Sequence, residues 1–235
     1  MKRLLASAAA VTAPSRYLVQ EMQPYRNEVR LLSNALNVGS YGFRLREQPA
    51  PRLVWFRAFH SIYNPALAPP VVALLAAKIP DVRLRMVGPD KRDGSRRRTE
   101  ELAHRLGLNS RVEFVAGVPK KEAPTTLSAA DVFLNTTNVD NTPVSVLEAM
   151  ACGLCVVSTN VGGIPYLLKH EKDALLVPPN DPEAMAAAVR RTLTEPGLAA
   201  RLSENARRKA EQFDWSIVLP QWEKLLMEVV ERGRA

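Results

Sequence analysis

The chain has 235 residues, of which 46% are hydrophobic and 24% are charged, and its formal net charge is +8 at pH 7. This length allows one large domain, or one domain with part of another, and excludes two complete large domains. The apolar content excludes a disordered chain, while the positive charge favours an anionic partner without identifying it.

The first 47 residues predict one small βαβ unit. We expect a strand over residues 8–13, a helix with a serine cap over 15–25, and a second strand over 28–32. A unit of this size does not bury both faces of its own sheet. The two basic residues and alanine-rich stretch at the start resemble a secretory signal, but an apolar part made mostly of alanine disfavours that interpretation.

Residues 37–51 are polar, aperiodic and rich in turn-forming residues, so we expect a linker there. From Arg52 onward, β-branched or aromatic runs alternate with helical patterns, which predicts a doubly wound α/β fold with a parallel, Rossmann-like sheet. The expected strands are 53–56, 83–87, 112–116, 132–135, 155–159 and 174–177. The expected helices between them are 70–78, 95–106, 124–130 and 144–151.

After the last strand the pattern is wholly helical. Helices are expected over residues 182–194, 198–212 and 215–232. Asp181 is placed to cap the first of them, with Pro182 in its first turn.

The two cysteines, Cys152 and Cys155, form a lone C-x-x-C within an apolar run. No histidine stands at a zinc-ligand spacing from them, so we expect two buried thiols and no metal site. Thiols without a disulfide framework suit a reducing cytoplasm. No apolar run reaches the roughly 18 residues of a membrane-spanning helix.

The basic run over residues 91–98 contains no aromatic residue, which disfavours nucleic-acid binding by base stacking. We expect a solvated loop and helix start, with phosphate or lipid contact as the alternative. Among the histidines, His60 lies near Arg57 and is a candidate to face a site. His104 and His170 are expected to be solvated.

The most informative stretch is residues 135–153. Asp140 and Glu148 are separated by seven residues, and Pro143 is expected in the first turn of the helix that carries Glu148. The polar loop 140–142 therefore leads into a helix N-terminus, whose free N–H groups favour a phosphate or a sugar hydroxyl. A carboxylate at Glu148 can accept hydrogen bonds from a vicinal diol such as ribose. From spacing alone, a capping Asp140 and a solvated Glu148 remain equally open.

Residues 140–154, together with the turn at residues 162–165, resemble the donor-site signature of retaining GT-B glycosyltransferases (glycosyltransferase family 4, group 1 type). That signature has two glutamates separated by seven residues, an Ala-Met-Ala-x-Gly turn and a Gly-Gly-x-Pro turn. The resemblance covers most of residues 52–213. It implies an N-terminal acceptor-domain remnant and linker start (1–47), a nucleotide-sugar-binding domain (48–213) and a C-terminal crossover helix (214–235).

The resemblance also implies roles for single residues. Glu148 would bind the ribose, Asp140 would face the donor sugar, and Arg57 would neutralise the diphosphate, so Asp140 and Arg57 are the expected catalytic pair. The other donor-binding residues would be Asn141, Thr142, Pro143 and Val144, in the loop whose backbone N–H groups meet the sugar and diphosphate, and Gly117 and Val118, beside the base.

Four positions depart from the family pattern. Asp140 is one methylene shorter than the usual glutamate, which alters the sugar contact or moves the loop inward. Ile62 stands where a lysine is usual, so we expect weaker neutralisation of the diphosphate. Tyr166 replaces a glutamate and Cys155 a proline, which we interpret as packing changes.

The resemblance implies transfer of a sugar from a nucleotide diphosphate donor to a hydroxyl, with retention and without cofactor or metal, in the cytoplasm. We expect a nucleotide-sugar donor and no nucleic acid as partners, with peripheral membrane contact of a full-length enzyme and self-association of the fragment left open. By itself the fragment is expected to be inactive. The alternatives are a sugar-nucleotide epimerase of the same fold and a non-catalytic nucleotide- or nucleic-acid-binding module.

Overall fold

The computed structural model describes residues 2–234 and has a six-stranded sheet at its centre. In spatial order the strands are β5 (Val112–Val115), β4 (Arg83–Val87), β3 (Arg52–Phe56), β6 (Val132–Asn135), β7 (Cys155–Thr159) and β8 (Leu175–Val177). All neighbouring pairs are parallel. The order runs outward from β3 to β5 on one side and from β6 to β8 on the other. This is the predicted doubly wound arrangement.

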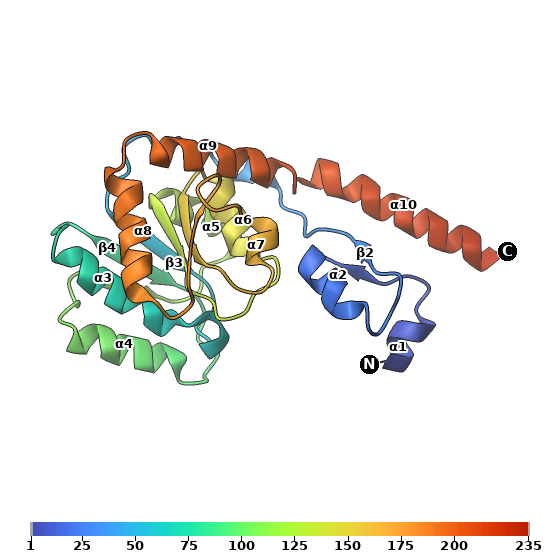
Figure 1. Ribbon diagram of the computed structural model, residues 1–235, viewed down its shortest axis with the longest axis horizontal. Coiled ribbons are helices and arrows are strands. Elements are labelled where there is room, and N and C mark those ends of the chain that lie inside the picture. Colours follow the sequence, from blue (N-terminus) through green and yellow to red (C-terminus); the bar gives the residue numbers. More distant parts are fainter. Residues whose placement is uncertain (1, 235) are drawn as a thin grey trace.

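Helices cover both faces of this sheet (Figure 1). Alternate residues of β3 enter opposite cores: Leu53 and Trp55 pack in one, and Val54 in the other. The first core includes residues of α3 (Ala68–Ala76), α4 (Ser95–Arg105) and α8 (Pro182–Thr194). The second includes residues of α5 (Ala123–Ser128), α6 (Val144–Ala151) and α7 (Ile164–Leu167). Burial on both faces explains why the central strands are continuous apolar runs in the sequence.

The elements predicted from residue 52 onward are confirmed to within two residues at each end. The last two helices are α9 (Leu198–Glu211), which contributes to both cores, and α10 (Trp215–Arg234). Asp181 caps α8 as predicted, and its carboxylate accepts the N–H of Ala184 at 2.8 Å. Pro143 is the N-cap residue of α6 rather than a residue of its first turn. Short 3-10 helices lie at Val38–Ser40, Ser61–Tyr63, Pro65–Leu67 and Lys120–Glu122.

The N-terminal unit has less strand than predicted. Its first strand is only β1 (Thr12–Ala13), preceded by helix α1 (Lys2–Ser7), and its second is only β2 (Arg30–Leu31), which pairs parallel with β1. The predicted helix is α2 (Arg16–Met22), with Ser15 as its N-cap. The alanines over residues 8–10, which follow α1, are poor strand formers and lie outside both the helix and the strand. A two-stranded sheet also has few neighbours to extend its ladder, which accounts for the short strands.

Helix α10 runs from the sheet domain past the N-terminal unit (Figure 1). Arg30 of β2 forms an ion pair with Glu228 of α10. The segment that leaves the N-terminal unit lies beside the segment that leads into α10. The Leu36 N–H donates to the Phe213 carbonyl at 2.8 Å, and the Trp215 N–H donates to the Leu36 carbonyl at 3.2 Å. Within residues 2–234, no helix combines the length and apolar character needed to cross a membrane.

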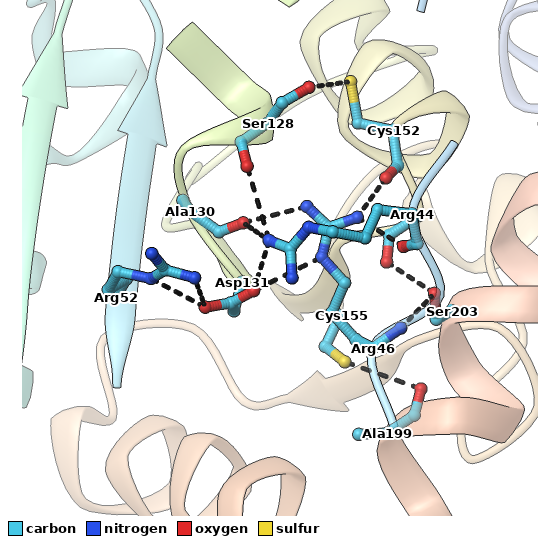
Figure 2. A network of polar contacts seen from close by, with 11 residues as sticks. Arg44, Arg46, Arg52, Ser128, Ala130, Asp131, Cys152, Cys155, Ala199 and Ser203 are labelled. Carbon is cyan, nitrogen blue, oxygen red and sulfur yellow. Dashed lines mark hydrogen bonds and ion pairs between the residues drawn. The ribbon is translucent and has the colours of Figure 1, made fainter. Parts of the chain in front are cut away.

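Residues 37–51, which we expected to be a linker, pack against the sheet domain through a few buried side chains. Val38 and Tyr41 are buried in the second core. The side chain of Arg46 is also fully buried and donates hydrogen bonds to the carbonyls of Ala130 and Cys152 (Figure 2). The segment is therefore held against the sheet domain at these residues.

One buried carboxylate holds much of this segment in place. Asp131, directly before β6, lies 2.6 Å from Arg44, 3.4 Å from Arg46 and 2.8 Å from Arg52, measured between side-chain oxygen and nitrogen (Figure 2). Because Arg46 is fully enclosed, its charge depends on this carboxylate and on the nearby carbonyls. The sequence pattern of this segment does not reveal that Asp131, far along the chain, is the partner of its arginines.

Both cysteines are free, buried thiols, as predicted. Burial raises the pKa of Cys152 and raises that of Cys155 to about 12. Such thiols are protonated near neutral pH and are poor nucleophiles. In the described part of the chain, no three His, Cys, Asp or Glu residues are grouped to hold a metal ion.

Candidate functional site

A cavity of about 440 Å³ opens at the carboxyl ends of the central strands. Its walls come from the segments that follow β3, β4 and β5 and from the loop that leads into α6. Open α/β sheets bind ligands at this edge, where crossovers in opposite directions leave a crevice. Seven of the nine predicted site residues line it: Arg57, Gly117, Val118, Asp140, Thr142, Pro143 and Val144.

A larger cavity, of about 530 Å³, lies near the amino ends of β3 and β4 and is lined by several arginines. These arginines already have partners. Arg52 is paired with Asp131, while Arg83 and Arg111 donate to the Pro80 carbonyl. The smaller cavity is therefore the better candidate for the site, because it lies at the carboxyl edge of the sheet and is lined by the predicted residues.

Arg57 is fixed on three sides at the edge of the smaller cavity. Its Nη2 lies 2.5 Å from Asp140 Oδ2, and its Nη1 donates to Ser145 Oγ at 3.1 Å. The guanidinium carbon lies 4.0 Å from the centre of the Tyr63 ring. A planar guanidinium held in this way presents a preorganised set of donors to an anion such as phosphate.

Asp140 is largely buried, with 10% of its side chain exposed. This burial raises its pKa, while the charge of Arg57 and the N–H of Asn141 act in the opposite direction. The Asn141 N–H donates to Asp140 Oδ1 at 2.8 Å. The carboxylate is therefore oriented by Arg57 and by its own loop, and it does not act as the N-cap of α6, which is Pro143.

Two glycines allow the walls of the cavity to approach one another. A Cβ atom at Gly88 would lie 1.6 Å from the Arg57 carbonyl oxygen, and one at Gly163 would lie 2.1 Å from the Asn141 carbonyl oxygen. The Gly163 N–H also donates to the Asp140 carbonyl at 2.8 Å. The Gly-Gly turn found in the sequence thus supports the 140–142 loop, and Gly88 brings the end of β4 against the segment that holds Arg57.

The N-terminus of α6 faces the same cavity through Val144 and Ser145. The first N–H groups of a helix have no partner within the helix and carry its positive dipole end. Together with the guanidinium of Arg57, they make this wall of the cavity suitable for an anion.

Glu148 does not line the cavity, although it lies on α6, one turn beyond its start. The residue is only 7% exposed, so the alternative of a solvated charge is wrong. Its Oε1 accepts the hydroxyl hydrogen of Tyr41 at 2.7 Å. Burial raises the pKa of Glu148, and the hydrogen bond from Tyr41 opposes that change.

Asn141 is the other predicted residue outside the lining, because its side chain faces the N-terminal unit. The Ser15 hydroxyl donates to Asn141 Oδ1. Thr142 donates from Oγ1 to the Pro14 carbonyl at 3.1 Å, and Asn34 Nδ2 donates to the Thr142 carbonyl at 3.1 Å. The loop next to the cavity is therefore in direct contact with the N-terminal unit.

His60 does not line the cavity. Its Nδ1 accepts the N–H of Ile62 at 3.1 Å, which places it in the 3-10 turn after β3. Ile62 itself is 40% exposed and brings no charge. His104 and His170 are exposed, as predicted.

Sequence reasoning gave no role to Tyr41, Tyr63 or Ser145. Tyr63 and Ser145 directly follow positions that the motif had marked, Ile62 and Val144, so their neighbourhood could have been found but not their contacts with Arg57. Tyr41 lies in the supposed linker, and no local pattern indicates its contact with Glu148.

Comparison with known proteins shows the family. The profile of the family described as "Glycosyl transferases group 1" matches residues 57–209. The chain is 33% identical over 168 residues to a D-inositol 3-phosphate glycosyltransferase of Saccharomonospora viridis, covering 67% of this chain and 39% of the relative. A protein of the same name from Thermobispora bispora is 30% identical over 179 residues, covering 72% and 42%. The chain thus spans about two fifths of these relatives.

Solved structures show the same fold. Sucrose-phosphate synthase from Thermosynechococcus elongatus superposes with a TM-score of 0.84 at 25% identity, covering 98% of this chain and 61% of that one. HepE from Anabaena, solved with UDP and glucose, gives 0.84 at 21% identity, covering 97% and 66%. With the parallel sheet, the cavity at its carboxyl edge and the family match in agreement, the chain belongs to the group 1 glycosyl transferases and has the fold of a GT-B C-terminal domain.

Proposed function

We propose that this chain is the donor-binding part of a retaining glycosyltransferase, which transfers a sugar from a nucleoside diphosphate sugar to a hydroxyl acceptor. The observation that carries the proposal is the position of Arg57, held by Asp140, Ser145 and Tyr63 at the cavity edge beside the N-terminus of α6. A preorganised cation next to free N–H groups favours the charge that develops on a leaving diphosphate.

In this proposal each wall of the cavity meets one part of the donor. Arg57 and the start of α6 stabilise the diphosphate, without a divalent metal ion. Asp140 and the 140–142 loop face the sugar. Glu148, which lies one turn further along α6 and outside the cavity lining, accepts hydrogen bonds from the ribose. Gly117 and Val118, after β5, lie beside the base. The complex of HepE with UDP and glucose supports the assignment of a uridine nucleotide as the first donor to test.

Calorimetric titration with UDP and UMP tests the proposal. We expect UDP to bind more tightly, because Arg57 and the helix dipole act on the second phosphate. Arg57→Ala should remove most of this preference, whereas Arg85→Ala, a partly exposed arginine paired with Glu113, should leave it unchanged. Equal affinity of the parent protein for the two nucleotides, or no binding at millimolar concentration, contradicts the proposal.

We further propose that these 235 residues alone transfer no sugar. Holding the acceptor hydroxyl near the anomeric carbon lowers the activation barrier to sugar transfer by about 7 to 11 kcal/mol. The matched relatives are more than twice as long as the region they share with this chain, and we assign acceptor binding to the remainder. An assay with radiolabelled sugar nucleotides and a broad panel of acceptors measures sugar transfer by these residues. Multi-turnover transfer contradicts this part of the proposal.

Self-association and a cytoplasmic location belong to the same proposal. Trp215, Leu226 and Met227 of α10 are 50%, 58% and 66% exposed, which favours association of apolar surfaces. The two free thiols suit a reducing compartment. Sedimentation velocity at several concentrations measures the association, and a monomer throughout the range contradicts it.

A further inference from the structure

We propose that Tyr41 is a positioning residue for the ribose-binding carboxylate: its hydroxyl holds one oxygen of Glu148 so that the other remains available to a ribose hydroxyl. This inference rests on the proposed function, because Glu148 has that role only if the cavity binds a nucleotide. It assigns part of the donor site to a segment that the sequence pattern indicated was a linker.

The contact between the two side chains is short and enclosed. Tyr41 is 4% exposed and Glu148 is 7% exposed, and the distance from the hydroxyl oxygen to Oε1 is 2.7 Å. A phenol that donates to a buried carboxylate forms a charge-assisted hydrogen bond, which is stronger than one between neutral groups. Rotation of the Glu148 carboxylate therefore requires the loss of this bond.

The two oxygens of Glu148 are in different situations. Oε1 is bonded to Tyr41, whereas Oε2 accepts no hydrogen bond from any residue in the range 2–234. Within the same range, the enclosed side-chain atoms that lack a hydrogen bond are Arg46 Nε and Ser95 Oγ, so Oε2 is not sealed from solvent. A carboxylate can accept several hydrogen bonds, so we assign the ribose hydroxyl to the oxygen that has no donor in the protein.

The backbone around Tyr41 is anchored on both sides, which makes the ring a firm support. Before it, the Val38 N–H donates to the Asp214 carboxylate at 3.0 Å. At the residue itself, Arg207 donates to the Tyr41 carbonyl at 3.0 Å, and after it Arg46 is buried beside Asp131. The ring packs in the second hydrophobic core. A side chain held by packing and by its own backbone can fix the orientation of a neighbour.

The proton of this hydrogen bond stays on Tyr41. Burial and the adjacent Glu148 both raise the pKa of Tyr41 well above its ordinary value. The phenol therefore remains a donor at any pH at which the protein is expected to work. Burial raises the pKa of Glu148, and the hydrogen bond from Tyr41 and the charges of Lys120 and Arg57 oppose this rise.

The test compares UDP with its 2',3'-dideoxy analogue by calorimetry on the parent protein, Tyr41→Phe, Glu148→Ala and the double variant. We expect Tyr41→Phe to weaken UDP binding by roughly 5- to 30-fold, which is less than the loss of a direct hydrogen bond to a charged group because Tyr41 acts through Glu148. Binding of the dideoxy analogue should be unchanged, because it has no diol to contact Glu148. In the Glu148→Ala background, Tyr41→Phe should have little further effect on UDP.

Tyr166→Phe is the matched control, because it removes another tyrosine hydroxyl, one that donates to Gln20 at 2.6 Å, and should leave both affinities unchanged. Equal losses for UDP and the dideoxy analogue in Tyr41→Phe would show a merely structural role and overturn the inference, as would unchanged UDP binding. If the parent protein does not distinguish the two nucleotides, the ribose role of Glu148 fails, and the inference fails with it. If the parent distinguishes them and Tyr41→Phe does so equally well, only the role of Tyr41 is lost.

Discussion

Arg57 and Asp140 meet at the edge of the cavity, with 2.5 Å between guanidinium Nη2 and carboxylate Oδ2. We expect Asp140→Ala to weaken binding of an intact sugar nucleotide by about 1.5 to 3 kcal/mol, the usual effect of losing a charged hydrogen-bonding group. Binding of the bare diphosphate should change less, because Arg57 remains and only the sugar contact is lost. Calorimetry with UDP-glucose and UDP measures the difference, and Asp81→Ala, at an exposed aspartate before β4, is the control. Equal losses for both ligands would assign Asp140 to positioning Arg57 alone.

Glu148→Ala should weaken binding of a ribonucleotide by roughly 1.5 to 3 kcal/mol, about 10- to 150-fold. The physical reason is the loss of a buried carboxylate that accepts hydrogen bonds from the diol. The measurement is calorimetry with UDP, together with a thermal melt to confirm that the variant remains folded. Glu113→Ala, which removes a carboxylate paired with Arg85 on the surface, should bind normally. Unchanged UDP affinity in a folded Glu148→Ala protein would exclude the ribose role.

The stability of Glu148→Gln relative to the parent should increase with pH. Burial raises the pKa of Glu148 from its ordinary value of 4.5, so the folded parent binds this proton more tightly than the unfolded parent. Its free energy of unfolding therefore falls as the pH rises from about 4.5 through the raised pKa. Glutamine has no such titration, and Asp140 titrates in both proteins, so its contribution cancels. Urea denaturation between pH 4 and 8 measures the difference, and a flat or falling difference would contradict the prediction.

Gly163→Ala should disturb the loop that carries Asp140. The new Cβ would lie 2.1 Å from the Asn141 carbonyl oxygen, and overpacking of this kind costs about 1 to 3 kcal/mol of stability. UDP-glucose binding should weaken as well, because the loop has to move. Gly42→Ala is the matched control, since no heavy atom lies within 4 Å of its new Cβ. Denaturation and calorimetry on both variants check the prediction, which fails if the two behave alike.

Asp131→Asn should destabilise the protein by about 3 to 5 kcal/mol, because it leaves the enclosed charge of Arg46 without its carboxylate. The loss should release residues 37–51 from the sheet domain, which hydrogen exchange of that segment would detect. Glu113→Gln breaks an exposed pair with Arg85 and should cost only about 0 to 1 kcal/mol. Similar losses for the two variants would show that Asp131 contributes no more than a surface charge.

Much of the fold was predictable because it depends on local pattern. Runs such as 155–159, buried on both faces, have few interpretations other than a central parallel strand. The cap at Asp181 also followed from its own neighbours along the chain. The packing of residues 37–51 was not predictable, because the burial of Tyr41 and Arg46 depends on Glu148 and Asp131, about 85 to 107 positions away.

The site residues that belong to a sequence motif were predictable, whereas those that contact the site only through the folded arrangement were not. The motif brought Arg57, Asp140 and the start of α6 to one cavity. It did not indicate that Asn141 would turn toward Ser15 or that Tyr63 would stack on Arg57. Both contacts join segments that are far apart in sequence or separated by a turn, and their partners follow only from the folded chain.

The glycine at position 88 also limits how this gene can change. Every single-base change of a glycine codon that replaces the residue introduces one that carries a Cβ atom. At position 88 that atom would lie 1.6 Å from the Arg57 carbonyl oxygen. No missense change there is conservative, since even alanine requires the end of β4 and the arginine segment to separate. Random mutagenesis with selection for donor binding should therefore recover fewer substitutions at position 88 than at position 42, where the space around the backbone is open.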